Sequence, residues 1–299
     1  MEQSRAAYLV EALPYIRNYQ GATLVIKYGG HAMVDESLRD SFAQDVALLR
    51  FVGFNPVVVH GGGPQIDELL KRLKIEYRFV EGQRFTDPAT MDVVEMVLCG
   101  RVGKDIVNRI TRAGGEAIGL SGKDAGLIKA VRKRLPSRNA DLAATPETID
   151  IGQVGEPSSI NISVLTHMTS GGFIPVIAPI GVDDLGVTYN INADTVAAAV
   201  AVAMKAARLI LLTDVPGVLD KENNVIERLT DAQVPELKKS GVISGGMLPK
   251  LDCCVSAIRG GCKSTSIIDG RVPHSLLLEL FTDKGCGTEI AAAIPPVKP

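Results

Sequence analysis

Short runs of apolar, β-branched residues alternate with longer segments whose apolar residues recur every three or four positions. The first run, Thr23–Tyr28, precedes residues 36–53, in which Phe42, Val46 and Leu49 share one helical face. The same patterns predict strands at 56–60, 117–121, 173–180, 208–214 and 264–269, and helices at 64–74, 88–112, 160–171, 192–207, 230–240, 247–261 and 275–281. Because strands that alternate with helices form sheets covered on both faces, we predict an α/β fold: a three-layer αβα sandwich around a central, mainly parallel sheet.

Three segments depart from this alternation. Residues 124–155 are rich in charges and turn residues, and their β-like pattern predicts a hairpin that leaves the sheet. The polar stretch Gly181–Gly186 is interpreted as a joint between two lobes. Ala6–Tyr19 has helical periodicity, but Pro14 lies inside it and predicts a kink, since proline removes a backbone hydrogen bond. This kinked N-terminal helix either packs on its own domain or forms an arm that packs on another subunit.

Composition and charge narrow the function classes. Lys and Arg number 32 against 34 Asp and Glu in 299 residues, so the near-neutral chain offers no electrostatic footprint for nucleic acid or an anionic membrane. Five cysteines without a C-x-x-C pair argue against a disulfide framework or a zinc site. No apolar run approaches the length of a membrane span, and the N-terminus lacks the apolar core of a signal peptide. We therefore expect a cytoplasmic protein.

Glycines cluster where predicted strands end, which is the edge at which open α/β sheets bind ligands. Gly29-Gly30 follow the first strand, Gly61–Gly63 follow the second, and Gly245-Gly246 precede a helix. Glycines at such turns let backbone N–H groups approach an anion. Neither standard nucleotide motif is present, because the P-loop candidate at 260–264 has Cys before its Lys, and the second glycine turn lacks the third glycine of a dinucleotide fingerprint.

Several polar residues lie near these turns. Lys27 ends a buried apolar strand, where a long cation needs a partner, so a functional role is favoured over a solvated one. Lys250 lies near a helix start, Asp194 opens the Ala-rich helix, and Arg84 lies in a Gly-Gln-Arg-Phe-Thr segment. Each of these three fits an ordinary surface or helix-end position equally well. Asn190, two residues before the expected N-cap of the Ala-rich helix, has no structural explanation.

No residue stands out as a general base. The four histidines are widely spaced and form no metal-binding set, and His60 is interpreted as a turn or core residue. A hydroxyl acceptor in phosphoryl transfer needs help in losing its proton, whereas a carboxylate acceptor, with a pKa of about 4, is already ionised at pH 7. Two lysines and a cradle of backbone N–H groups would then be nearly the whole catalyst.

Seven motifs occur in the order and at the spacing of a known family. They are VIKYGGHAM (25–33), VVVHGGGPQI (57–66), GQRFTD (82–87), MDVVEMVL (91–98), YNINADT (189–195), LLTDVPGVL (211–219) and GGMLPK (245–250). On these motifs the chain resembles the amino acid kinase family, and within it the members that phosphorylate N-acetyl-L-glutamate. The resemblance implies an N-terminal lobe (21–182) that binds the acyl amino acid and a C-terminal lobe (183–299) that binds ATP.

The resemblance also implies a reaction, in which the γ-phosphoryl group of ATP passes to the side-chain carboxylate of N-acetyl-L-glutamate in arginine biosynthesis. Lys27 and Lys250 would stabilise the transition state, and Asp194 would orient both lysines. The remaining matched residues would bind the two substrates: N-acetylglutamate at Gly62, Gly63, Arg84 and Asn190, and ATP at Gly29, Gly30, Thr213, Asp214 and Gly246. Mg²⁺ would be held mainly by phosphate oxygens and water, without a dense carboxylate cluster.

Regulation is a further implication of the resemblance. The N-terminal helix, residues 1–20, is similar to an extension of arginine-inhibited members, in which paired helices link dimers into a homohexamer, a trimer of dimers. L-Arginine would pair its guanidinium with Glu279 beside Gly285, and its carboxylate with Lys205, and so inhibit by favouring an open arrangement of the lobes. Members from photosynthetic lineages also bind a PII-type nitrogen signalling protein, which is a further partner to consider.

Two kinds of alternative stay open. A glutamate 5-kinase or a kinase of carrier-bound aminoadipate shares the phosphate machinery and differs at the acceptor pocket. A catalytically inactive arginine sensor would keep the fold and the arginine site, although the presence of Lys27, Asp194 and Lys250 together argues against it. Phosphorylation of N-acetylglutamate rather than glutamate separates the kinases, and formation of ADP separates a kinase from a sensor.

Overall fold

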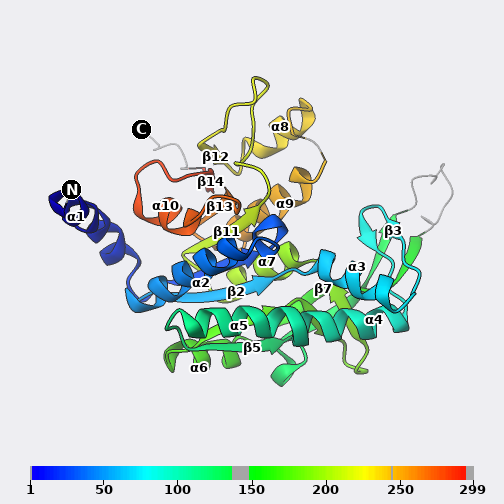
Figure 1. Ribbon diagram of the computed structural model, residues 1–299. Helices are drawn as coiled ribbons and strands as arrows, with labels where there is room; N and C mark the ends of the chain where they lie inside the picture. Colours follow the sequence, from blue (N-terminus) through cyan, green and yellow to red (C-terminus); the bar gives the residue numbers. More distant parts are fainter. Residues whose placement is uncertain (1, 137–147, 244, 294–299) are drawn as a thin grey trace.

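The computed structural model describes residues 2–136, 148–243 and 245–293 (Figure 1). The strands of its main sheet are β1 (Thr23–Tyr28), β2 (Asn55–His60), β5 (Ala117–Ser121), β8 (Ile174–Ala178), β11 (Arg208–Thr213), β12 (Arg228–Thr230), β13 (Ser264–Asp269) and β14 (Thr288–Ala291). Within the described ranges they form one sheet in the order β12-β14-β13-β11-β1-β2-β8-β5. Neighbours there are parallel except for β13 and β14, which confirms the predicted, mainly parallel sheet.

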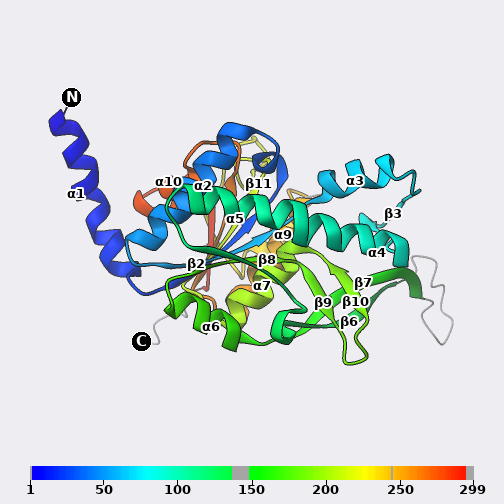
Figure 2. The same cartoon turned by 60° about the horizontal axis from the view of Figure 1, so that its bottom comes forward.

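Helices cover both faces of this sheet (Figures 1 and 2). They are α2 (Glu36–Phe51), α3 (Gly63–Arg72), α4 (Pro88–Glu95), α5 (Gly103–Arg112), α6 (Ile162–Ser170), α7 (Ala193–Ala203), α8 (Val234–Lys239), α9 (Met247–Arg259) and α10 (Ser275–Phe281). Side chains of successive strand residues point to opposite faces, so each strand serves two cores. Ile26 packs in a core with α2, α5 and α10, whereas Val25 packs in a second core with α6, α7 and α9. The two cores confirm the predicted three layers.

The predicted helix over 88–112 is continuous but changes its winding. α4 passes into a π-helical segment, Met96–Val102, before α5 begins, and the N–H of Gly103 donates to the carbonyl of Leu98, five residues back. This wider turn directs both Leu98 and Val102 at Gly62, where an added Cβ would lie 2.6 Å from Leu98 Cδ2 and 3.4 Å from Val102 Cγ2. Such π segments occur frequently at functional sites.

A small β-barrel stands at the end of the molecule opposite to the N-terminal helix (Figure 2). It consists of β6 (Ile128–Pro136), β7 (Thr148–Ile160), β9 (Ile180–Val182) and β10 (Thr188–Ile191). The antiparallel pair β6 and β7 confirms the predicted hairpin, whose residues 137–147 lie outside the described residues. Residues 181–186 end β9 and form the turn to the antiparallel β10, in which the Asp183 carboxylate accepts the N–H groups of Leu185 and Val187.

The N-terminal helix α1 (Glu2–Tyr19) runs through Pro14 and projects from the body of the molecule (Figures 1 and 2). Its last turns contact the domain, since the Tyr15 hydroxyl donates to Asp283 and the ring of Tyr19 lies 6.0 Å from that of Phe54. Val10, one turn before Pro14, is 69% exposed. Two short 3₁₀ segments, Gly30–Met33 and Asp124–Gly126, and a two-stranded hairpin, β3 (Phe79–Val80) and β4 (Gln83–Arg84), complete the fold. None of the described helices is both long and apolar enough to cross a membrane.

Candidate active site

A cleft of about 370 Å³ opens beside the carboxyl ends of β1 and β2. Two glycine turns, Gly29-Gly30 and Gly61–Gly63, form part of its wall. The opposite wall comes from the end of β10 and the start of α7, residues 190–194, and Lys250 of α9 reaches in. The cleft therefore lies where parallel strands, helix N-termini and glycine turns converge, as expected of a ligand site in an open α/β sheet.

Asp194 lies between two lysines. Its Oδ1 is 3.1 Å from Nζ of Lys27, and its Oδ2 is 2.8 Å from Nζ of Lys250. Burial lowers the pKa of Lys27, while the carboxylate of Asp194 opposes this shift. Burial alone would raise the pKa of Asp194, but the ammonium groups of Lys27 and Lys250 outweigh it and hold that pKa below its usual value. The carboxylate thus stays ionised and aligns two cations on one side of the cleft.

Local sequence explains why these three groups meet. Lys27 is the fifth residue of β1 and follows the fully buried Val25 and Ile26. Asp194 lies in the first turn of α7, where the Asn192 side chain accepts the N–H groups of Asp194 at 2.9 Å and Thr195 at 3.1 Å. This confirms Asn192 as the N-cap. Both elements end or begin at the same edge of the sheet, so their side chains converge.

At two glycines of the cleft, a side chain would displace a neighbouring residue. A Cβ at Gly29 would lie 2.5 Å from Nζ of Lys27, and one at Gly62 would press on Leu98. Gly63 is the first residue of α3, whose opening N–H groups have no partner within the helix. A helix N-terminus with backbone this accessible favours a bound anion.

Arg84 is buried beside the cleft on strand β4. Its Nη1 is 2.6 Å from Oδ1 of Asp67, and the guanidinium carbon lies 5.1 and 4.8 Å from the ring centroids of Tyr77 and Phe79. The aromatic rings and Asp67 fix the plane of the guanidinium, whose remaining N–H groups can bind a carboxylate in a bidentate way. Asn190, across the cleft, donates from Nδ2 to Oγ1 of Thr86 at 3.3 Å.

The cleft gathers most of the residues that the sequence singled out. Those that line it are Lys27, Gly29, Gly30, Gly62, Gly63, Arg84, Asn190, Asp194 and Lys250. Three residues predicted to bind ATP are not among its described lining residues. Thr213 ends β11 in the core, Gly246 precedes α9, and Asp214 lies against Gly30, where its carboxylate would collide with an added Cβ.

Sequence reasoning missed several residues that line the cleft or hold its lining residues in place. Asp67, the partner of Arg84, follows Gly63 by one helical turn, a spacing that could have indicated it. Phe79 is 54% exposed and borders the cleft, and an exposed aromatic residue just before a glycine-containing turn is a usable signal. The sequence does not indicate that Leu98 lines the cleft, because the direction of its side chain depends on the π-helical winding.

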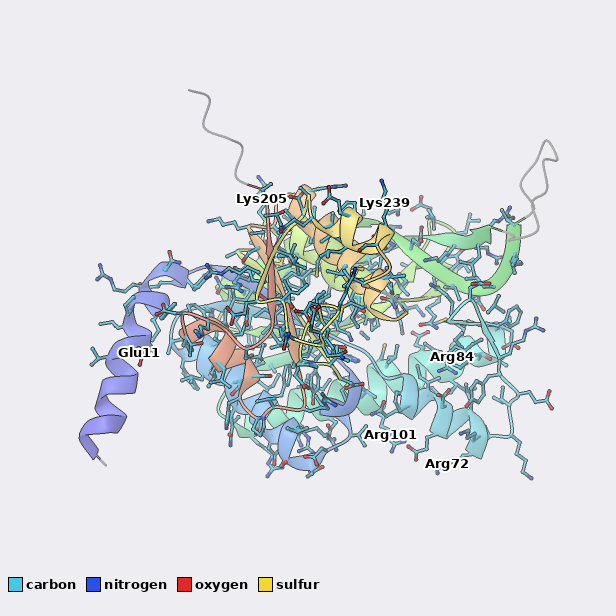
Figure 3. The ribbon with its side chains drawn as sticks, turned by 90° about the horizontal axis from the view of Figure 1, so that it is seen from above. Glu11, Arg72, Arg84, Arg101, Lys205 and Lys239 are labelled. Atoms are coloured by element: carbon cyan, nitrogen blue, oxygen red, sulfur yellow. The ribbon has the colours of Figure 1, made fainter. Side chains whose placement is uncertain are left out.

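A second pocket, of about 210 Å³, lies between the last turns of α1, α10 and residues 284–289. Glu279 and Gly285 line it, as the predicted effector region requires. However, Glu279 already has partners: its Oε1 is 2.8 Å from Nη2 of Arg208, and its Oε2 accepts the N–H of Cys286 at 3.0 Å. Lys205 is exposed and is not among the described residues of this pocket; Figure 3 shows it well apart from α1.

Among the described residues, no group of three or more His, Cys, Asp or Glu side chains is placed to hold a metal ion. The carboxylate of Asp194 in the cleft forms salt bridges with Lys27 and Lys250. The arrangement in the cleft is therefore that of a site for polyanions: two ammonium groups, a guanidinium and glycine backbone around one carboxylate.

Comparison with known proteins identifies the class. The sequence pattern of the amino acid kinase family matches residues 22–269, and the chain belongs to this family. It is 56% identical over 289 residues to the acetylglutamate kinase of Solidesulfovibrio magneticus and 54% identical over 293 residues to the acetylglutamate kinase of Novosphingobium aromaticivorans. In both cases the match covers 97% of this chain and 97% of the relative.

Solved structures share the fold. The N-acetylglutamate synthase of Neisseria gonorrhoeae, complexed with coenzyme A and N-acetyl-glutamate, superposes with a TM-score of 0.82 at 25% identity. That match covers 97% of this chain but 64% of the synthase, so this chain spans less than two thirds of it. The carbamate kinase of Giardia lamblia bound to AMP-PNP gives a TM-score of 0.65 at 16% identity, over 91% of this chain and 99% of the kinase, and shows the fold alone.

Proposed function

We propose that this chain transfers the γ-phosphoryl group of ATP to the side-chain carboxylate of N-acetyl-L-glutamate, giving N-acetyl-L-glutamyl 5-phosphate and ADP. The two acetylglutamate kinases that match it over 97% of its length support this assignment. The observation that carries it is the Lys27–Asp194–Lys250 group, with Lys27 and Asp194 buried, in a cleft lined by two glycine turns.

The reaction needs charge stabilisation more than proton transfer. An oxygen of the ionised acceptor carboxylate attacks the γ-phosphorus, the bond from that phosphorus to the bridging oxygen breaks, and ADP leaves with the electron pair. Lys27 and Lys250 neutralise the charge that gathers on the transferred group, and Asp194 keeps both ammonium groups in place. No proton has to leave the acceptor, because a carboxylic acid with a pKa of about 4 is ionised at pH 7.

The acceptor and ATP occupy different parts of the proposed site. Arg84 pairs with the α-carboxylate, while Gly62 and Gly63 of the lobe of residues 21–182, and Asn190 of the other lobe, bind the remainder of N-acetylglutamate. Gly29, Gly30, Thr213, Asp214 and Gly246 contact ATP, mainly in the lobe of residues 183–299. Mg²⁺ would arrive with ATP, held mainly by phosphate oxygens and water, and would neutralise part of the phosphate charge.

The charge of the cleft favours the acylated amino acid over glutamate. Among the described lining residues, Lys27, Arg84 and Lys250 face one carboxylate, Asp194, and Asp67 beside the cleft pairs with Arg84, so positive charge stays in excess. The α-ammonium group of glutamate would add a further positive charge, whereas acetylation removes it. The same argument disfavours a glutamate 5-kinase.

A coupled assay of ADP release tests the proposal. Wild-type protein with ATP and Mg²⁺ should release ADP with N-acetylglutamate, and much less with an equal concentration of glutamate. Lys250→Ala should abolish most of this release, while Lys71→Ala, at the exposed end of α3, should behave as wild type. The assignment would be overturned if ADP were released with glutamate but not with N-acetylglutamate, or at the same rate without any acceptor.

We further propose feedback inhibition by L-arginine at the second pocket, in a homohexamer linked through α1. The carboxylate of Glu279, the turn at Gly285 and the exposed side chain of Val10 support this, and Lys205 takes part only if the chain around it moves. Deleting residues 1–20 should give an active dimer that responds weakly to arginine. A wild-type dimer in ultracentrifugation that is indifferent to millimolar arginine would contradict both parts. A cytoplasmic location and a PII-type partner rest on the resemblance alone and stay predictions.

A further inference from the structure

His60 is the last residue of β2 and directly precedes the three glycines of the cleft wall. Its side chain is fully buried, and its Nδ1 lies 2.9 Å from the carbonyl oxygen of Gly61. Its Nε2 has no hydrogen-bond partner among the described residues. Burial lowers the pKa of His60 to about 4, so the ring is neutral at pH 7. Because a carbonyl oxygen only accepts, the single ring proton belongs on Nδ1.

The other edge of the ring faces the long helix where its winding changes. A Cβ at Gly103 would lie 3.2 Å from Nε2 of His60 and 2.9 Å from the carbonyl oxygen of Leu98. The N–H of Gly103 is already donated to that carbonyl, so this stretch of helix gives Nε2 no backbone donor. The π segment thus closes the space around the ring and leaves Nδ1 as its one bonded nitrogen among the described groups.

This bond fixes the direction of a peptide group that borders the cleft. A trans peptide points its C=O and its N–H in opposite directions. With the carbonyl of Gly61 directed at His60, the N–H of Gly62 points away from the ring. Gly61, Gly62 and Gly63 line the cleft, whereas His60 is not among its lining residues. The N–H of Gly62 therefore lies on the side of this peptide away from His60, and the peptide itself borders the cleft.

We propose that His60 is a positioning residue for phosphoryl transfer: its Nδ1–H holds the Gly61 carbonyl out of the cleft, so that the Gly62 N–H is presented to the anionic substrates. This inference rests on the proposed function of the cleft. Peptides between glycines turn over readily, because no Cβ restricts them. A reversed Gly61–Gly62 peptide would direct a carbonyl oxygen, instead of an N–H, at an anion, and repel it.

The tautomer of His60 gives a direct test that needs no substrate. In protein labelled with ¹⁵N-histidine, the ring nitrogens of His60, assigned through their loss in His60→Asn, should show protonated Nδ1 and unprotonated Nε2 from pH 5.5 to 8. A proton on Nε2, or an imidazolium ring in this range, would overturn the proposal. This result is independent of whether wild-type protein phosphorylates N-acetylglutamate, which the ADP assay decides separately.

Three substitutions separate positioning from simple packing. An Asn amide can donate from near the position of Nδ1, a Gln amide reaches only the position of Nε2, and Leu fills space without a donor. We expect His60→Gln and His60→Leu to lose kcat by about tenfold or more, the scale of one misdirected donor, with His60→Asn retaining kcat within about threefold of wild type. Equal kcat values for His60→Asn and His60→Gln would overturn the proposal. If His60→Leu fails to fold, the comparison of the Asn and Gln variants still tests it.

Discussion

The cleft and the second pocket, beside the last turns of α1, have similar ion-pair arrangements with opposite charges. In the cleft, one buried carboxylate, Asp194, is shared by Lys27 and Lys250. In the pocket, one buried guanidinium, Arg208, is shared by Glu279 at 2.8 Å and Glu289 at 3.5 Å. In the pocket, Glu289 also lies 3.7 Å from Nε of Arg228. Among the described lining residues, the cleft has three basic side chains to one acidic, and the pocket has four acidic side chains to three basic. The cleft is therefore built for anions, and the pocket for a cation.

The two regions also differ in how firmly they hold their charge. Burial lowers the pKa of Lys27, so the cleft can lose a positive charge under alkaline conditions. Burial acts in the same direction on Arg208, but Tyr19, Glu279 and Glu289 outweigh it, and the net pKa is raised. An arginine cannot be deprotonated in a protein in any case. Arg208 of the pocket thus keeps its charge under alkaline conditions, whereas Lys27 of the cleft can lose its own.

The largest effect is expected from Glu279→Ala, because this variant leaves the buried guanidinium of Arg208 without its main carboxylate partner. Breaking such a pair by removing one partner costs about 3–5 kcal/mol of unfolding free energy. Chemical denaturation should show this loss, and the double variant Arg208→Met with Glu279→Ala should recover much of it. Arginine inhibition should be lost in Glu279→Ala, with catalysis intact. If Glu279→Ala were as stable as wild type, the ion pair of Arg208 and Glu279 would be solvated. It would then not resemble the buried ion pairs of Asp194 in the cleft.

Removal of one cleft cation comes next in size. Lys27→Ala should lower kcat by at least about 100-fold, since a charge-stabilising contact in the transition state is worth this much. The KM values should change less, because substrate binding retains Lys250, Arg84 and the glycine turns. Steady-state kinetics with Lys71→Ala as the matched lysine control provide the check, and a kcat near the wild-type value would remove Lys27 from the mechanism.

A smaller effect distinguishes shape from charge at Arg84. Arg84→Lys keeps the charge but loses the planar fork that a carboxylate binds, so we expect the KM for N-acetylglutamate to rise about tenfold, with little change in the KM for ATP. Arg78→Lys is the matched control, since Arg78 stacks 4.6 Å from the ring of Phe85 but does not line the cleft among its described residues. If the KM for ATP rises instead, Arg84 binds ATP and not N-acetylglutamate, and the proposed role of Arg84 is wrong.

The smallest effect concerns pH. The lowered pKa of Asp194 keeps its carboxylate ionised throughout the neutral range, so kcat should be flat there. The lowered pKa of Lys27 means that its positive charge is lost as the pH rises, and kcat should fall at a pH below the ordinary lysine value of 10.5. The tightness of arginine binding to the pocket should persist through this fall. A kcat that holds to pH 10.5 would contradict a desolvated Lys27.

Local patterns predicted most of the fold and much of the site. Lys27 at the end of an apolar strand, and glycines after strands, are short-range signals that the structure brings into one cleft. The π segment was not predictable, because apolar spacing over seven residues does not separate its winding from that of an α-helix. The pair of Arg208 and Glu279 spans 71 residues, and no local pattern connects them. The hairpin at Gly181–Gly186 depends on the Asp183 turn, which a polar stretch does not distinguish from a linker.

Chemical trapping of the product tests the central claim most directly. An acyl phosphate reacts with hydroxylamine to give a hydroxamate, whereas phosphate released by hydrolysis does not. With ATP, Mg²⁺ and N-acetyl-L-glutamate, mass spectrometry should detect the 5-hydroxamate of N-acetylglutamate in amounts equal to the ADP formed, and Lys250→Ala should yield little of either. ADP formed without hydroxamate, or hydroxamate formed equally well from glutamate, would contradict a cleft that joins ATP to the side-chain carboxylate of an N-acylated amino acid.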